Sequence, residues 1–139
     1  MKTNKLRFDV TVMPPAKIGK ERLKTFGHCH SIAKDSLTYP EIYQVIKGKA
    51  YYLLQSFKGE RKVKRVVCIK AKEKDIILIP PNYGHVTINP SDQTLIMANW
   101  VYANLKSSYE PFENSEELVI IILKEKNGYK IQIMKQFQR

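Results

Sequence analysis

The fold class is decided by the stretch Glu41-Ile-Tyr-Gln-Val-Ile-Lys47-Gly48-Lys49-Ala50-Tyr-Tyr-Leu-Leu-Gln55. Both halves are rich in β-branched and aromatic residues, as β-strands are, and the Lys47-Gly48-Lys49 segment between them predicts a hairpin turn. Farther out, Leu6–Val12 alternates strictly between apolar and polar residues, which indicates a half-buried strand. The same reasoning predicts strands at Lys62–Lys70, Asp75–Ile79, His85–Asn89, Leu95–Tyr102, Leu118–Leu123 and Tyr129–Met134.

These strands, about nine in all, follow one another at close and regular spacing. Seven prolines and six glycines are distributed along the chain as turn signals between short elements. The pattern predicts an all-β fold, either an antiparallel sandwich or a jelly roll. A short helix is expected in Lys17–Lys24 or in Tyr102–Glu117, and no window keeps a helical period over about ten residues.

Length and composition indicate a single domain that spans residues 1–139. A chain with 43% hydrophobic and 27% charged residues can bury a core, which excludes a disordered or collagen-like protein. No apolar run approaches the roughly 18 residues of a membrane-spanning helix, and no apolar stretch follows the basic N-terminus to make a signal peptide. We therefore expect a cytoplasmic protein, whose two cysteines, Cys29 and Cys68, are too few for a disulfide scaffold.

The chain carries a formal net charge of +11, which favours anionic partners such as nucleic acid, anionic lipid or a phosphorylated metabolite. Its most basic segment, Lys58–Arg65, is interpreted as a solvated hairpin whose lysines protect a sheet edge. No aromatic residue is interleaved there for base stacking, so a nucleic-acid patch is the less favoured interpretation.

The three histidines of the chain, His28, His30 and His85, are its candidate chemical groups. If His28 and His30 lie in a strand, both side chains point to one face, and the cysteine between them points to the other. Glu41 and Tyr43 share a face of the next strand in the same way. Three imidazoles and one carboxylate form a mixed N/O set that suits iron(II), manganese, nickel, cobalt or zinc. Spacing alone leaves a metal site and a chance His-x-His pattern equally open.

Two motifs around these residues resemble the signatures of the cupin-type glucose-6-phosphate isomerases of archaea. The first is Thr25-Phe-Gly27-His28-Cys-His30, followed after ten residues by Glu41-Ile-Tyr43. The second is Pro80-Pro81-Asn-Tyr-Gly-His85-Val-Thr-Ile-Asn89. The run Thr11–Glu21 is similar to the family's approach to the first motif, so the resemblance covers roughly Leu6 to Tyr109. It implies a cupin, that is, a double-stranded β-helix (jelly-roll) barrel, and a homodimer.

The resemblance also implies a role for each matching residue. One divalent metal ion, with iron(II) expected and manganese, nickel, cobalt or zinc as alternatives, would be bound by His28, His30, Glu41 and His85. The substrate phosphate would be held by Thr11, Thr25 and the backbone of Gly27. The sugar would face Tyr43, with Tyr102 and Tyr109 lining the site. The candidate catalytic residues are Glu41 and Tyr43.

The implied activity is the interconversion of glucose 6-phosphate and fructose 6-phosphate, an aldose–ketose isomerisation of glycolysis and gluconeogenesis. A metal ion would polarise the carbonyl, and either Glu41 would relay a proton or the ion would direct a hydride shift. Departures from the family pattern at Asn82 and Ser107, and the absence of the N-terminal stretch of longer members, leave alternatives open. These are another metal-binding cupin, such as an oxygenase or a different sugar isomerase, and a non-catalytic cupin that binds a sugar phosphate.

Overall fold

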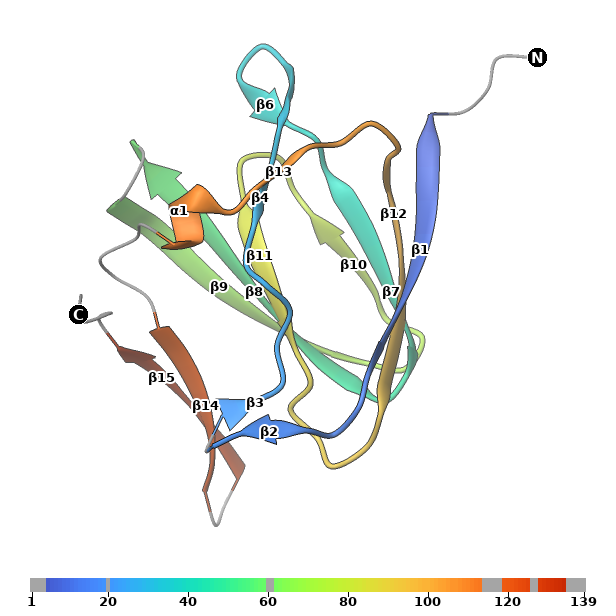
Figure 1. Ribbon diagram of the computed structural model, residues 1–139, viewed down its shortest axis with the longest axis vertical. Helices are drawn as coiled ribbons and strands as arrows, with labels where there is room; N and C mark the ends of the chain where they lie inside the picture. Colours follow the sequence, from blue (N-terminus) through green and yellow to red (C-terminus); the bar gives the residue numbers. More distant parts are fainter. Residues whose placement is uncertain (1–4, 20, 60–61, 114–118, 126–127, 135–139) are drawn as a thin grey trace.

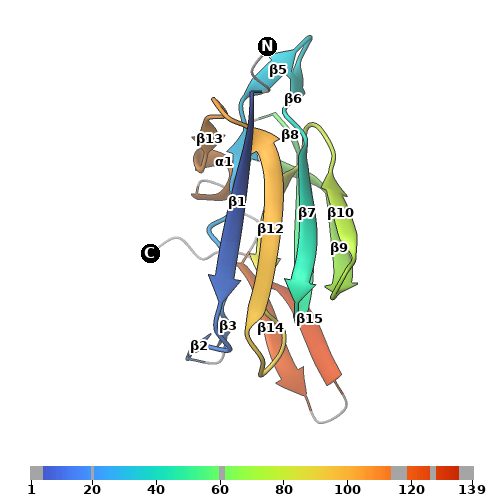
Figure 2. The same cartoon turned by 90° about the vertical axis from the view of Figure 1, so that its right-hand side faces the viewer.

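The computed structural model describes residues 5–19, 21–59, 62–113, 119–125 and 128–134, and the fold is all-β, as the sequence predicts. Two larger antiparallel sheets face each other (Figure 1). One has the order β1-β12-β7-β10, with β1 at Leu6–Met13, β12 at Leu95–Tyr102, β7 at Glu41–Lys47 and β10 at Ile76–Ile79. The other has the order β11-β8-β9, with β11 at Gly84–Ile88, β8 at Lys49–Lys58 and β9 at Lys62–Lys72. Figure 2 shows the first sheet face on, with its four strands side by side.

Alternation along the strands determines which side chains face the inside of the barrel. On β7, Glu41, Tyr43 and Val45 are buried and the residues between them are exposed. A strand turns successive side chains to opposite faces, so the pattern that predicts β7 also places Glu41 and Tyr43 inward. Between the two sheets lies a hydrophobic core made of Met13, Tyr43, Val45, Ala50, Tyr52, Leu54, Ala71, Ile77, Ile79, Leu95 and Met97.

The predicted hairpin at Lys47-Gly48-Lys49 is wrong in its pairing. Gly48 does turn the chain, with φ at +88°, but β7 and β8 lie in different sheets and pair with other strands. A Cβ at Gly48 would lie 2.8 Å from the carbonyl oxygen of Thr94, so glycine allows the chain to turn a corner against that loop. Residue type predicts the strands and the turn, whereas the choice of partner strand depends on burial and packing against neighbours.

The helix expected in Lys17–Lys24 is also wrong. The described part of this segment forms β2 at Lys17–Ile18 and β3 at Glu21–Arg22, which pair with each other. Gly19 between them has φ at +61°, a left-handed conformation that does not continue a right-handed helix. The alternative location is confirmed, because α1 forms one turn at Glu110–Glu113.

Six further strands are short or belong to the C-terminal part of the chain. They pair as β4 (Cys29–His30) with β13 (Ser107–Ser108), β5 (Ile32–Lys34) with β6 (Leu37–Thr38), and β14 (Val119–Glu125) with β15 (Gly128–Met134). The last pair confirms the two predicted C-terminal strands, although Leu118 at the start of the first lies outside the described residues. Within the described part of the chain, no helix has the length and apolar character needed to cross a membrane.

Candidate metal centre

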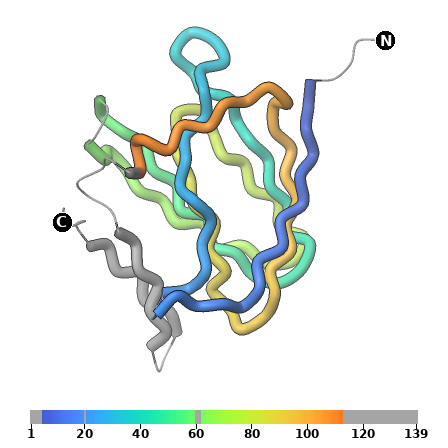
Figure 3. The backbone as a smooth tube through the Cα atoms, viewed as in Figure 1, coloured from blue at the N-terminus to red at the C-terminus, as the bar shows by residue number. Residues whose placement is uncertain are grey.

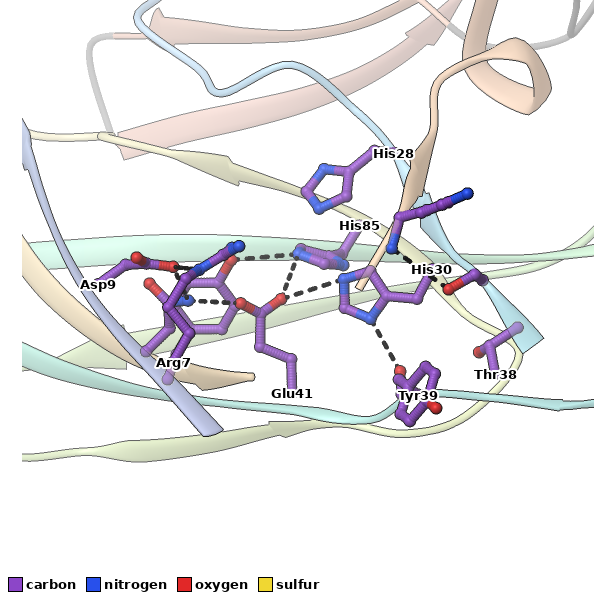
Figure 4. A network of polar contacts seen from close by, with 12 residues as sticks. Arg7, Asp9, His28, His30, Thr38, Tyr39, Glu41 and His85 are labelled. Carbon is purple, nitrogen blue, oxygen red and sulfur yellow. Dashed lines mark hydrogen bonds and ion pairs between the residues drawn. The ribbon is translucent and has the colours of Figure 1, made fainter. Parts of the chain in front are cut away.

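Four side chains from three separate parts of the sequence converge inside the barrel. His28 precedes β4, His30 lies in it, Glu41 begins β7 and His85 lies in β11. One ligand atom from each residue can be chosen so that all four lie within 4.8 Å of one another. Figure 4 shows the carboxyl group of Glu41 directed toward the rings of His30 and His85, with His28 beside them.

Backbone pairing brings the first two histidines to the third. The amide of His85 donates to the carbonyl oxygen of His28 at 3.0 Å, and the amide of His28 donates to that of His85 at 3.4 Å. In Figure 3 the segment that leads into β4 runs beside β11. The pairing continues along both segments, because the Thr25 amide donates to the Thr87 carbonyl oxygen at 2.8 Å. The ring centroids of His28 and His85 are 4.6 Å apart as a result.

Hydrogen bonds at the outer nitrogens fix the tautomers of two histidines. His30 Nδ1 lies 2.8 Å from the carbonyl oxygen of Tyr39, and His28 Nδ1 lies 3.2 Å from that of Phe26. A carbonyl oxygen only accepts, so each Nδ1 carries the hydrogen and, in the neutral ring, each Nε2 keeps a lone pair. A backbone carbonyl oxygen that accepts a hydrogen bond from one ring nitrogen orients the other nitrogen of an imidazole toward a metal ion. The two lone pairs are therefore available to a cation.

The donor atoms fit one divalent cation. Glu41 Oε2 lies 3.3 Å from His30 Nε2 and 3.2 Å from His85 Nε2, yet Oε2 and His30 Nε2 are buried without a hydrogen-bonding partner. Ligand bonds of about 2.1 Å separate two donors by at most about 4.2 Å, so the set needs to contract only slightly around an ion. Three imidazole nitrogens and a carboxylate oxygen suit iron, manganese, nickel, cobalt or zinc. This group of residues could hold a metal ion.

The protonation states also favour a cation. Burial raises the pKa of Glu41, but the neighbouring His30 and His85 more than offset it and lower the pKa to about 2, so the carboxylate is ionised at neutral pH. Burial, followed by the charge of His85, lowers the pKa of His28 from 6.5, which keeps that ring neutral. Metal ions bind ionised carboxylates and neutral imidazoles, which are the forms these groups take.

Two polar side chains contact this cluster from the inner face of the first sheet. The hydroxyl of Tyr43 lies 3.2 Å from His85 Nε2, and burial, followed by the charge of Glu41, raises its pKa above the usual value. Tyr43 therefore keeps its proton. The amide Nδ2 of Asn99 donates to Glu41 Oε1 at 2.7 Å. Sequence reasoning did not identify Asn99, because an asparagine within a strand carries no spacing signal.

The predicted phosphate-binding residues come from β1 of the first sheet and from the segment before β4. Thr11 lies half-buried in β1, opposite Met97. Thr25 lies against β11, where its Oγ1 accepts the amide of Thr87 at 2.9 Å. Gly27 packs against the ring of Phe112, because a Cβ at Gly27 would lie 2.4 Å from that ring. The close approach that this glycine permits in the structure is to an aromatic ring of α1.

The two predicted aromatic residues, Tyr102 and Tyr109, differ in their relation to the cluster. The ring of Tyr109 is 5.9 Å from that of His28 and 5.8 Å from that of Phe26, and it is 44% exposed. The ring of Tyr102 stacks on that of Tyr39 at 4.4 Å and 7°, so it contacts the residue whose carbonyl oxygen holds His30. Tyr109 thus borders the cluster directly through the His28 ring, whereas Tyr102 pairs with Leu6 toward the outer face of the first sheet and is connected to the cluster only through Tyr39.

Cys29 does not belong to the ligand set, as the alternation of side chains predicts. Its Sγ lies 2.6 Å from the position that a Cβ on Gly84 would take, on the side where Phe112 packs. Burial raises the pKa of the thiol to about 11, so the sulfur keeps its proton at neutral pH. A protonated thiol is a poor metal ligand.

Comparisons with known proteins show the family of this chain. A glucose-6-phosphate isomerase family model matches residues 1–139. The glucose-6-phosphate isomerase of Thermococcus litoralis is 36% identical over 95 residues, covering 68% of this chain and 45% of that protein. That of Pyrococcus furiosus is 35% identical over 95 residues, covering 68% and 46%. The chain thus spans about half the length of these curated relatives.

The fold comparison points to the same architecture. A Klebsiella pneumoniae protein with a double-stranded β-helix domain superposes with a TM-score of 0.54 at 18% identity, covering 79% of this chain and 78% of that one. The barrel described above is thus a double-stranded β-helix, the cupin fold that the motifs imply. With a family model that matches residues 1–139 and relatives at 35–36% identity, the chain belongs to the glucose-6-phosphate isomerase family.

Proposed function

We propose that this chain interconverts glucose 6-phosphate and fructose 6-phosphate with the help of one divalent metal ion. The observation that carries the proposal is the convergence of His28, His30, Glu41 and His85 within 4.8 Å in a chain that belongs to this family. Iron(II) is the proposed metal, and the same donor set also accepts manganese, nickel, cobalt or zinc. A bound ion supplies Lewis acidity, which polarises a sugar carbonyl oxygen.

Two residues of the cluster are proposed to act on the sugar. Glu41, with a pKa of about 2, is a weak base, and its charge is better suited to holding a cation than to carrying a proton. Tyr43 keeps its proton and lies beside His85, so its hydroxyl can donate to a sugar oxygen. Glu41 and Tyr43 are therefore the two residues proposed to contact the substrate, and their placement is compatible both with a hydride shift directed by the ion and with a proton relay through Glu41.

The phosphate of the substrate is proposed to bind at Thr11, Thr25 and the backbone of Gly27. The hydroxyl oxygen of Thr25 accepts the Thr87 amide, so the hydrogen of that hydroxyl can be donated to a phosphate oxygen. Tyr109, whose ring lies beside that of His28, is proposed to border the sugar, and Tyr102 is proposed to act there only through Tyr39, on which its ring stacks. Binding energy from a remote phosphate would orient the reacting carbons.

A direct test uses one preparation of the protein. Chelator-treated protein should lose the isomerase activity measured in a coupled assay, and iron(II), manganese or nickel should restore it. Metal-loaded protein that turns over neither sugar phosphate would refute the proposal. Oxygen uptake would then favour an oxygenase, and saturable sugar-phosphate binding without product would favour a non-catalytic cupin.

We further propose that residues 1–139 form one domain, that the protein works in the cytoplasm where sugar phosphates are retained, and that it is a homodimer. The proposed dimer surface is the outer face of the first sheet, which Figure 2 shows toward the viewer. Cross-strand pairing aligns Phe8 with Trp100 and Trp100 with Ile42 on this face. The exposed apolar residues on it are Leu6, Phe8, Val10, Val12, Ile42, Ile46, Ile76, Leu78 and Trp100.

The area and chemistry of this face suit a second copy of the chain. Each side chain is about half exposed and offers on the order of 100 Å², so the face presents roughly 900 Å² of apolar surface. A stable interface needs about 800 Å² per partner. The outward residues on the four strands are uncharged apart from the strand ends, so two copies can meet across a two-fold axis without opposing like charges.

The dimer is tested by two matched substitutions. Ile76 on the proposed face is 70% exposed, and Ile32 on β5 outside it is 67% exposed. We expect Ile76→Glu to yield monomers in sedimentation velocity at micromolar concentration, while Ile32→Glu remains dimeric like the unmodified protein. If the unmodified protein itself sediments as a monomer, the proposed dimer is contradicted.

A further inference from the structure

Asn99 lies on β12, between the neighbouring strands β1 and β7 of the first sheet. In the register of the sheet it faces Asp9 on β1 and Tyr43 on β7, and Glu41 is the next inward residue on β7. Asn99 is 6% exposed, so its amide group must find its hydrogen-bonding partners within the protein.

The partners of Asn99 fix the orientation of its side chain. Its Nδ2 lies 2.7 Å from Glu41 Oε1 and 3.4 Å from Asp9 Oδ2. Carboxylate oxygens accept hydrogen bonds, so the NH₂ end of the amide, not its carbonyl end, faces both Glu41 and Asp9. Asp9 is in turn held by Arg7, whose Nε lies 2.8 Å from the same oxygen, Oδ2. A chain of contacts therefore runs from the half-exposed Arg7 to Glu41.

In this series of contacts, the two carboxylate oxygens of Glu41 have different partners. Oε1 is held by Asn99, while Oε2 is the atom 3.2–3.3 Å from His85 Nε2 and His30 Nε2. A carboxylate held at one oxygen cannot rotate freely about its last bond, so the other oxygen keeps its direction. Without the amide, Oε1 would be buried without a donor and the carboxylate would turn to find one.

We infer that Asn99 is a positioning residue that keeps Oε2 of Glu41 directed at the metal centre. The inference rests on the proposed metal binding and adds a residue that is not itself a ligand. Asn99 acts through Glu41, with Asp9 holding the amide in the required orientation. The longer Asn99–Asp9 contact indicates that Asp9 is the weaker of the two partners.

The test compares cobalt(II) binding in four proteins. Asn99→Leu keeps the branched shape and neutrality of the side chain and removes the donor. Asn99→Asp also removes the donor and adds negative charge. Asn89, which is 1% exposed and whose Nδ2 donates to the backbone oxygens of Met13 and Gln93, offers a matched amide away from the ligand atoms, so Asn89→Leu is the control.

Loss of a residue that hydrogen-bonds to a metal ligand typically weakens metal binding about 10- to 100-fold. We expect Asn99→Leu and Asn99→Asp to weaken cobalt(II) affinity, measured by chelator competition, by about that factor. The visible absorption of bound cobalt(II), which reports ligand geometry, should change in both. Asn89→Leu should lower the unfolding midpoint and leave affinity and absorption unchanged. Should Asn99→Leu not fold, Asn99→Ala takes its place.

Each outcome bears on a separate conclusion. Unchanged affinity and absorption in Asn99→Leu would overturn the positioning role while leaving the metal site intact. Tighter binding by Asn99→Asp would also overturn it, because charge rather than hydrogen-bond donation would then govern affinity. An unmodified protein that binds no cobalt(II) would refute the proposed metal centre and the role of Asn99 together.

Discussion

Replacement of Gly27 by alanine tests how tightly the segment before His28 is packed. A Cβ at this position would lie 2.4 Å from one ring carbon of Phe112 and 2.8 Å from two others. Carbon atoms in ordinary contact are about 3.5–4.0 Å apart, so the ring must move by about 1 Å or more. Overpacking of this kind costs about 1–3 kcal/mol, and the half-buried position of Phe112 places the expected value near 1–2 kcal/mol.

The assay is chemical denaturation of Gly27→Ala, Phe112→Ala and the double variant. Phe112 packs on the cluster of Leu53, Val86 and Ile88, so Phe112→Ala destabilises by itself. In the Phe112→Ala variant the methyl group added at residue 27 no longer meets an aromatic ring. Gly27→Ala should therefore lower the free energy of unfolding of that variant by less than about 0.5 kcal/mol. The expected coupling free energy is therefore about 1–2 kcal/mol.

Gly84 provides the matched comparison. A Cβ there would lie 2.5 Å from the Phe112 ring and 2.6 Å from Cys29 Sγ. Removal of the ring relieves only the first contact, so Gly84→Ala should remain destabilising in the Phe112→Ala background. Additive effects of Gly27→Ala and Phe112→Ala, within about 0.5 kcal/mol, would refute this account of the packing.

Three further predictions concern the ligand set. His30→Ala should abolish metal loading, as judged by metal analysis of folded protein, whereas Cys29→Ser should load normally; full metal content in His30→Ala would exclude it as a ligand. In metal-free protein, the pKa of Glu41 is lowered from 4.5 to about 2, so its contribution to stability, about 3 kcal/mol, is present above pH 4.5 and lost as the pH falls toward 2. Denaturation at pH 6 and pH 3 should therefore show a smaller fall for Glu41→Gln than for the unmodified protein, and equal falls would contradict the lowered pKa. Tyr43→Phe should leave metal content unchanged and reduce turnover about 10²-fold or more if the hydroxyl donates to the sugar, and unchanged turnover would remove Tyr43 from the proposed site.

Sequence alternation predicts the long strands well, because burial of one face imposes a period of two on the residues. Leu6–Val12 and Leu95–Tyr102 are found as β1 and β12 almost at the predicted bounds. The same local information does not say which strands pair. Gly48 is a turn residue both in a hairpin and at a corner between two sheets, and only the packing of the whole barrel distinguishes them.

The four proposed metal ligands can be predicted from the sequence, because each histidine and the glutamate lies in a short continuous motif with a recognisable spacing. The structure adds their convergence, which follows from the pairing of His28 with His85 across two distant segments. Asn99 is different, since its contact with Glu41 depends on two strands that are neighbours only in the folded sheet. Phe112 likewise reaches Gly27 from a helix far along the chain.

The pairing of His28 with His85 has a consequence for how the protein folds. The two segments can meet only after a long intervening loop has closed, and such non-local contacts slow folding because chain entropy is lost before they form. A cation that recognises the finished cluster binds only after this closure and shifts the folding equilibrium by mass action. The apoprotein should therefore unfold more readily than the loaded one, by an amount that grows with the concentration of free metal.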